Sequence, residues 1–266
     1  MKWFAEVQAA LAKPRVCAAL KALNALVILG LAASVAGLAL EARANYAEVN
    51  RLRGDPLELE IYSTEITPEE VNALQRPLVM FYGDSRAADW KSPELKNAGS
   101  VVNRGIGGQT TDQCMLRMDF HLMPYKPDIV VLQVGVNDLK IIPLDKQKGE
   151  EVVGRVEENL QTMVNQLRAS GAKVIVTTIF PAGDPPLFRA PVWSPEIHRA
   201  IKQVNEYILK MGDGDQVTIW DVYPLLSTPN DRLRPEMARD FLHLNKTGYD
   251  YLSEILDEKI KALIAK

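Results

Sequence analysis

The stretch IVVLQVGVND, residues 129–138, joins a short apolar run to a glycine turn that carries an amide and a carboxylate. An apolar run that ends at a glycine is typical of a buried strand in a parallel sheet, because helices cover such strands on both faces. Ligands of parallel sheets bind beyond the carboxyl ends of the strands. Asn137 and Asp138 therefore follow the strand at the edge where a functional site is expected.

Similar runs and helical patterns alternate along the rest of the chain. The predicted strands are residues 78–82, 100–103, 129–134, 174–180 and 217–220. Apolar residues recur every three or four positions over 152–167, 197–208 and 252–263, which predicts amphipathic helices. This alternation predicts a three-layer α/β/α domain with a mostly parallel five-stranded sheet.

The composition is that of an ordinary globular protein and excludes several classes. The 266 residues include 31 Lys and Arg against 34 Asp and Glu, a net charge of −3, and the chain has no basic block. Disulfide-rich, collagen-like and disordered proteins are excluded, and we expect no nucleic-acid partner. Cys17 and Cys114 have no metal-site spacing, and no H-E-x-x-H motif or Cys/His cluster is present, so we expect neither a metal nor an organic cofactor.

The N-terminal part contains an uncharged run, residues 23–40, that predicts a transmembrane helix. As a helix it would extend about 27 Å, close to the ~30 Å hydrocarbon core of a bilayer. The predicted organisation is a basic segment (1–22), a signal anchor (23–40), a stalk or lead-in (41–77) and an α/β domain (78–266). A cleaved signal peptide and a buried core helix remain alternatives.

The flanking charges bear on the orientation of this helix. Four basic residues precede the run and three follow it, and the short basic N-terminus favours a cytoplasmic N-terminus with the domain on the extracytoplasmic side. Before Pro14, an interfacial helix is predicted because four apolar residues share one helical face: Trp3, Phe4, Val7 and Leu11.

The first predicted strand runs directly into Gly83-Asp84-Ser85-Arg86. A serine on a tight turn at the start of a helix exposes its hydroxyl and frees its backbone N–H, which suits a nucleophile. The same residues also suit an ordinary turn and helix cap. The G-x-S-x-G elbow of α/β-hydrolases is absent, which disfavours that family.

Three further motifs follow later strands. Glycines in NRGIGGQTT, residues 103–111, allow backbone N–H groups to approach a ligand; a phosphate cradle is the alternative, although neither phosphate-loop pattern matches. The Asn137 side chain could donate to an oxyanion. Asp240 stands three residues before His243, a spacing that lets a carboxylate accept the Nδ1 proton and leaves Nε2 as a base. We expect no catalytic role for His121, or for His198 on a solvated helix face.

These four motifs, in this order, resemble the SGNH hydrolase family, also called the GDSL esterase/lipase family, from residue 78 to the C-terminus. Residues 103–111 resemble its platelet-activating-factor acetylhydrolase branch. The resemblance implies a flavodoxin-like fold and five catalytic residues: Ser85 as nucleophile, the Gly105 N–H and the Asn137 side chain as oxyanion donors, and Asp240 with His243.

Two positions depart from the family pattern. Arg86 replaces the usual Leu, and Leu244 replaces a frequent Pro. A cation beside the nucleophile would favour an anionic substrate or pair with an acid. Four aromatic residues could line a pocket or serve in packing: Trp90, Tyr125, Phe188 and Trp193.

The resemblance implies a serine esterase that forms an acyl-enzyme on small-molecule, lipid or glycan esters. A membrane anchor favours acetyl or short-acyl esters of envelope glycans or lipids. An acyltransferase acting on envelope polysaccharide and a non-catalytic, membrane-tethered binding module remain alternatives. The sequence does not determine the oligomeric state.

Overall fold

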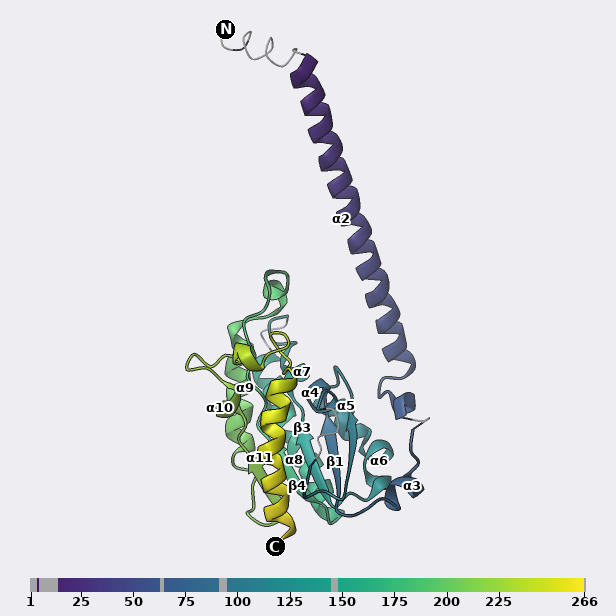
Figure 1. Cartoon of the computed structure of the whole chain (residues 1–266), viewed down its shortest axis with the longest axis vertical. Coiled ribbons are helices and arrows are strands. Elements are labelled where there is room, and N and C mark those ends of the chain that lie inside the picture. Colours follow the sequence, from purple (N-terminus) through teal and green to yellow (C-terminus); the bar gives the residue numbers. More distant parts are fainter. Residues whose placement is uncertain (1–3, 5–13, 63–64, 91–94, 145–147, 266) are drawn as a thin grey trace. The chain divides into compact units, whose positions relative to one another are not determined.

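The computed structural model describes residue 4 and residues 14–62, 65–90, 95–144 and 148–265 (Figure 1). The chain divides into two compact units, Met1–Pro56 and Leu57–Lys266.

The N-terminal unit is built on one long helix, α2 (Pro14–Gly54), which contains the predicted span 23–40. This helix is long and apolar enough to cross a membrane, a property that a membrane anchor and a signal sequence share. Its apolar side chains are exposed, with Leu26 and Leu29 each about two-thirds accessible. Cys17 is exposed on the same helix. The predicted interfacial helix falls, except for Phe4, outside the described residues.

The second unit contains the predicted five-stranded sheet, and every strand pair is parallel. The strands are β1 (Leu78–Gly83), β2 (Ser100–Gly105), β3 (Ile129–Gln133), β4 (Lys173–Thr177) and β5 (Val217–Trp220). Their order is β2-β1-β3-β4-β5. This is the flavodoxin-like order, in which the chain changes direction across the sheet between β1 and β3.

Strand β4 ends three residues before the predicted limit at residue 180. The Thr178 N–H still donates to the Trp220 carbonyl at 3.1 Å, but the next polar groups bond to side chains. The Thr178 hydroxyl accepts the Val222 N–H at 2.9 Å, and the Ile179 N–H donates to Asn205 Oδ1 at 2.7 Å. Ile179 and Phe180, which extend the apolar run in the sequence, therefore lie beyond the end of the strand.

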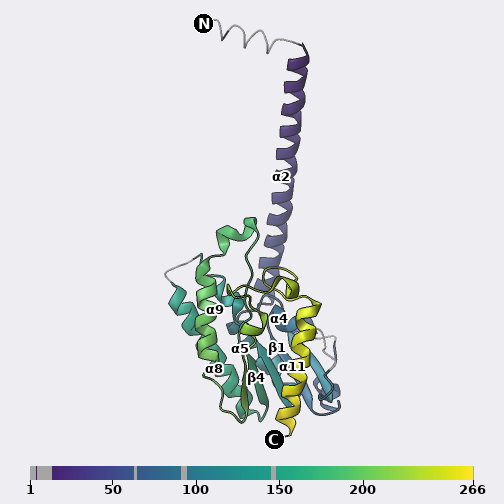
Figure 2. The ribbon, with the colours of Figure 1, turned by 60° about the vertical axis from the view of Figure 1, so that its left-hand side comes forward.

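Helices cover both faces of the sheet, as Figure 2 shows with α8 and α9 on one side and α11 on the other. One core lies under α3 (Pro68–Asn72), α5 (Thr111–Leu116), α6 (Met118–His121), α8 (Gly149–Ala169) and α9 (Pro195–Ile208). The other lies under α11 (Lys246–Ile264) and α10 (Tyr223–Leu226). Within β1, Met80 faces the first core and Phe81 the second. The three-layer α/β/α prediction is confirmed.

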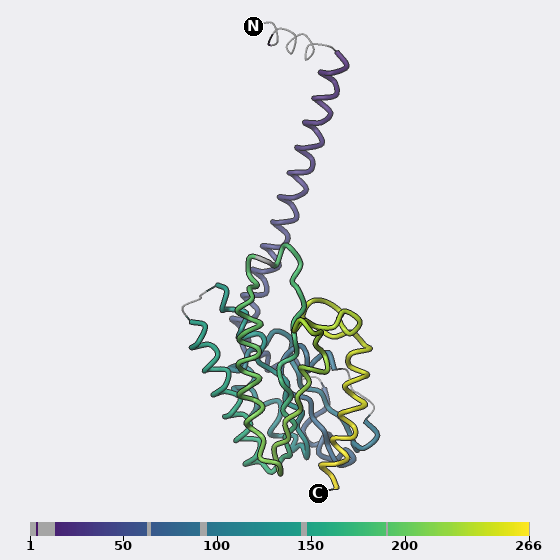
Figure 3. Tube along the Cα trace, turned by 90° about the vertical axis from the view of Figure 1, so that its left-hand side faces the viewer, coloured from purple at the N-terminus to yellow at the C-terminus, as the bar shows by residue number. Residues whose placement is uncertain are grey.

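The remaining elements are short and lie mostly in the connections. They are η1 (Leu59–Tyr62), α4 (Ser85–Ala88), η2 (Met123–Tyr125), α7 (Val136–Leu139), η4 (Leu187–Val192) and η5 (Pro235–Met237). Figure 3 shows the segments around η4 and η5 at the end of the domain opposite the C-terminus.

The segment 57–77 packs with the α/β domain, which differs from the expected lead-in over residues 41–77. Val71 of α3 is fully buried, and the Tyr62 hydroxyl donates to the Gly105 carbonyl at 2.6 Å. The charge-rich composition of this segment did not indicate these contacts, which join residues distant in the sequence. The compact domain begins at Leu57.

Candidate active site

The site lies at the carboxyl edge of the sheet, beside the point where the strand order reverses. β1 leads directly into α4, whose first residue is Ser85, and β3 leads through Gly135 into α7, which carries Asn137. Gly83 (φ +147°) ends β1, and a Cβ there would lie 1.8 Å from the Gln133 carbonyl oxygen. Only glycine permits this close approach of β1 to β3.

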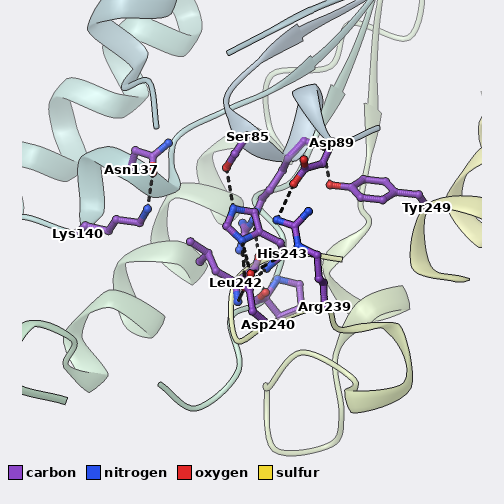
Figure 4. A network of polar contacts seen from close by, with 11 residues as sticks. Ser85, Asp89, Asn137, Lys140, Arg239, Asp240, Leu242, His243 and Tyr249 are labelled. Carbon is purple, nitrogen blue, oxygen red and sulfur yellow. Dashed lines mark hydrogen bonds and ion pairs between the residues drawn. The ribbon is translucent and has the colours of Figure 1, made fainter. Parts of the chain in front are cut away.

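Ser85 has the predicted position at the start of a helical turn. Asp84 is the N-cap of α4, and its Oδ1 accepts the Arg86 N–H at 2.9 Å. The Asp84 carboxyl is fully buried, and burial raises its pKa. The cap holds the turn so that the half-buried Ser85 side chain faces the loop that carries the histidine (Figure 4).

The predicted serine, histidine and aspartate form one connected chain of polar contacts (Figure 4). Ser85 Oγ lies 3.0 Å from His243 Nε2. His243 Nδ1 lies 2.9 Å from Asp240 Oδ2 and 3.0 Å from Oδ1. A hydroxyl, an imidazole and a carboxylate in this order can activate the serine oxygen by removing its proton.

The loop that carries Asp240 and His243 is held by its own backbone. The N–H groups of Leu242 and His243 both donate to Asp240 Oδ1 at 2.8 Å. Burial raises the pKa of Asp240, but these bonds and the bond to the His243 ring together outweigh that effect and hold the pKa below its usual value. Arg239, the preceding residue, forms an ion pair with Asp89 at 2.9 Å. The carboxylate therefore stays ionised and oriented toward the imidazole.

Asn137 is half-buried, and its side chain is bound at both ends. Its Nδ2 donates to the Gln109 carbonyl at 2.9 Å, and its Oδ1 accepts from Lys140 Nζ at 2.5 Å. Lys140 was not among the predicted site residues. The available signal was its position three residues after Asn137, which places both side chains on one face of a helical turn.

Gly105 lies beside the turn that carries Ser85, but its N–H is already engaged. It donates to Asn103 Oδ1 at 2.8 Å, and a Cβ at Gly105 would lie 2.3 Å from the Ala88 nitrogen. Gly105 therefore permits tight packing against α4 and does not present a free donor to an oxyanion. Gly107 and Gly108 are exposed, and a Cβ at Gly107 would lie 3.9 Å from Ser85 Cβ. Gly107 therefore lies beside Ser85 in an exposed part of this loop.

Two roles were open for Arg86, recognition of an anionic substrate or pairing with an acid, and its burial argues against the first. The side chain is fully buried and donates to backbone carbonyls of Leu242, Phe180 and Pro181 at 3.1, 3.0 and 3.4 Å. Burial lowers the pKa of Arg86 to about 10, although Asp84 opposes the shift. Arg86 joins the turn that carries Ser85 to the loop that carries His243 and to the segment that follows β4.

The other histidines and aromatic residues have mainly structural positions. His198 is 9% exposed, which contradicts the predicted solvated face, because it packs against Trp193 and accepts from its Nε1 at 3.4 Å. Trp90 and Tyr125 are also buried in packing, whereas Phe188 is 77% exposed.

A cavity of about 310 Å³ is lined by Asn137 together with, among others, Thr110, Asp112 and Arg155. Burial raises the pKa of the neighbouring Asp138 to about 6. Among the described residues, no cluster of three or more His, Cys, Asp or Glu side chains could hold a metal ion.

Two curated relatives, both from Bacillus subtilis, match parts of the chain. The uncharacterised lipoprotein YqeF is 33% identical over 100 residues, which cover 36% of this chain and 40% of YqeF. The uncharacterised esterase YxiM is 28% identical over 177 residues, which cover 62% of this chain and 43% of YxiM. The chain thus matches less than half the length of either relative.

Solved structures share the fold. The crystal structure of a GDSL-like lipase from Bacteroides thetaiotaomicron superposes with a TM-score of 0.60 at 23% identity, over 77% of this chain and 98% of that one. The sequence model of the GDSL-like lipase/acylhydrolase family matches residues 74–251. That range contains β1 to β5, the turn that carries Ser85 and the Asp240–His243 loop. With both the family pattern and the sheet order in place, the chain belongs to the GDSL-like lipase/acylhydrolase family.

Proposed function

We propose that this chain is a serine esterase that hydrolyses carboxylic esters through Ser85, His243 and Asp240. One observation carries the proposal: Ser85 Oγ lies 3.0 Å from His243 Nε2, while His243 Nδ1 lies 2.9 Å from Asp240 Oδ2. The second contact fixes the ring so that Nε2 is the nitrogen available to the serine proton.

The reaction has two steps. Ser85 Oγ attacks the ester carbonyl carbon while its proton moves to Nε2, and the imidazolium is stabilised by the Asp240 carboxylate. The tetrahedral intermediate then expels the alcohol, which takes the proton from Nε2, and leaves an acyl-serine. A water molecule gives a proton to Nε2, attacks the acyl carbon and releases the acid, and the proton returns to Ser85.

The oxyanion of both tetrahedral intermediates requires hydrogen-bond donors. We assign this role to the Ser85 N–H, to the second Nδ2 hydrogen of Asn137 and to a backbone N–H of residues 107–108. The hydrogen bond from Gly105 to Asn103 favours residues 107–108 over Gly105. Removal of one such donor typically lowers kcat by about 10²- to 10³-fold.

The proposed substrates are acetyl or short-acyl esters of glycans or lipids at a membrane surface. Helix α2 supports a location at a membrane, because its apolar side chains are exposed and it is long enough to cross a bilayer. We propose a single-pass anchor with the domain on the extracytoplasmic side. Protease treatment of intact cells tests this topology: cleavage of the domain supports it, and protection of the domain overturns it.

The esterase proposal is tested with the full chain in detergent and p-nitrophenyl esters of increasing acyl length. Wild-type protein is expected to turn over a short-chain ester, and Ser85→Ala to lose that activity. Mass spectrometry after rapid quenching should detect an acyl adduct on Ser85. Equal hydrolysis by wild type and Ser85→Ala would overturn the proposal. Added sugar or alcohol acceptors that divert the acyl group would instead identify a transferase.

A further inference from the structure

The amide of Asn137 is held between one acceptor and one donor. The Gln109 carbonyl can only accept, so it binds the NH₂ end, and the Lys140 ammonium can only donate, so it binds the oxygen end. The two contacts, at 2.9 and 2.5 Å, select the same rotation of the amide; Figure 4 shows the contact to Lys140. The opposite rotation would place oxygen against the carbonyl and NH₂ against the ammonium.

The acceptor end of this arrangement is itself rigid. Gln109 is almost fully buried, and its side chain donates to the Leu57 carbonyl at 3.0 Å and accepts from Arg117 Nε. Arg117 also donates to the Gly83 carbonyl at 2.9 Å, at the end of the nucleophile strand. These side-chain bonds hold Gln109 in place, and with it the main-chain carbonyl that accepts from Asn137. Through Arg117, Gln109 is linked to the strand that leads to Ser85.

The donor end places a cation close to the reacting groups. Lys140 is half-buried at the end of α7, and burial lowers its pKa, while the carboxylates of Asp84 and Asp240 act in the opposite sense. A cationic donor forms a stronger hydrogen bond than a neutral one, and it draws electron density from the amide oxygen. This polarisation makes the amide N–H a better donor.

We propose that Lys140 is a positioning residue for the oxyanion site: it holds the Asn137 amide with Nδ2 toward the ester carbonyl and strengthens that donor as negative charge develops. The inference rests on the proposed esterase function and extends it to a residue that does not touch the reacting atoms. Without Lys140, the main-chain carbonyl of Gln109 would be the one hydrogen-bond partner among the described residues that opposes rotation of the amide.

The test compares Lys140→Met, Asn137→Ala and the double variant in the full chain. Lys140→Met is expected to lower kcat about 10-fold or more with little change in KM, because the ester carbonyl carries little charge before attack. Lys140→Arg, which retains a cationic donor, should recover part of the loss. Lys210→Met, which removes an exposed lysine in the turn just after α9, is the control and should retain full activity.

The double variant separates positioning from a general effect of charge. If Lys140 acts through Asn137, its replacement has little further effect once Asn137 is alanine. An equal loss in both backgrounds, or wild-type kcat in a folded Lys140→Met variant, would overturn the inference. If Ser85→Ala is inactive, these two results overturn the role of Lys140 and leave the esterase proposal standing. Full activity of Ser85→Ala would remove the basis of both proposals.

Discussion

Arg86 Nε donates to the Leu242 carbonyl at 3.1 Å and so joins the residue after Ser85 to the residue before His243, 156 positions away. The same guanidinium binds the Phe180 and Pro181 carbonyls. Three segments that carry or border the site therefore share one buried side chain.

Replacement of Arg86 should affect both stability and activity. Arg86→Met leaves three carbonyls without this donor, and each buried unsatisfied group costs about 1–3 kcal/mol. We expect the free energy of unfolding in urea to fall by about 3 kcal/mol or more, and kcat to fall in the folded fraction because the His243 loop loses its link to Ser85. An unchanged unfolding midpoint with unchanged kcat would show that the link is dispensable.

Two glycine substitutions should have different effects. In Gly105→Ala the new methyl group lies 2.3 Å from the Ala88 nitrogen, so we expect a loss of stability, measured by thermal unfolding. In Gly107→Ala the methyl group lies at an exposed position 3.9 Å from Ser85 Cβ, so the protein should fold normally. We expect kcat to fall because the methyl group occupies space beside Ser85. The opposite pattern, a stable Gly105→Ala that is selectively inactive, would restore the oxyanion role to Gly105.

The stability of the domain should depend on pH through Asp138. Burial raises the pKa of this carboxyl to about 6 from an ordinary 3.8, although hydrogen bonds from Thr111 oppose the shift. The folded protein thus binds a proton between about pH 4 and 6 that the unfolded chain has lost, and stability from this group declines as the pH rises through that window.

Asp138→Asn removes this titration. The difference in unfolding free energy between wild type and Asp138→Asn should shift by up to about 3 kcal/mol between pH 4 and 7, with wild type relatively less stable at the higher pH. Urea unfolding at several pH values measures it, and parallel curves for the two proteins would contradict the assignment to Asp138.

The segment 57–66 should be required for activity. Leu57 binds the Gln109 side chain, Tyr62 binds the Gly105 carbonyl, and Glu65 forms an ion pair with Arg104 at 2.7 Å. We expect a chain that starts at Leu57 to retain kcat. A chain that starts at Thr67 should lose most of it, since the loop that follows β2 loses these supports.

A matched point variant tests the same segment without truncation. Tyr62→Phe removes one hydroxyl that donates to Gly105 and leaves the ring beside Arg104. A moderate fall in kcat with little loss of stability is the expected result. Equal kcat for both truncations would show that this segment only connects the two units.

The local sequence determined the sheet and the positions of the four motifs. Strands and amphipathic helices follow from apolar periodicity within short windows, and the turns after β1 and β3 follow from Gly83 and Gly135. Ser85, Asp240 and His243 could be assigned because the family motifs are contiguous stretches. The carboxyl ends of parallel strands meet at one edge, so those motifs were expected to lie together.

Only the tertiary structure decided which partner each polar group takes. Arg86 turns inward because three carbonyls from distant segments surround it, and Gly105 does not present its N–H because Asn103 captures it. The lysine contact to Asn137 and the packing of residues 57–77 likewise depend on side-chain rotamers and contacts between distant segments. Periodicity and spacing report the local backbone, whereas buried hydrogen bonds are satisfied by whichever group the complete fold brings within reach.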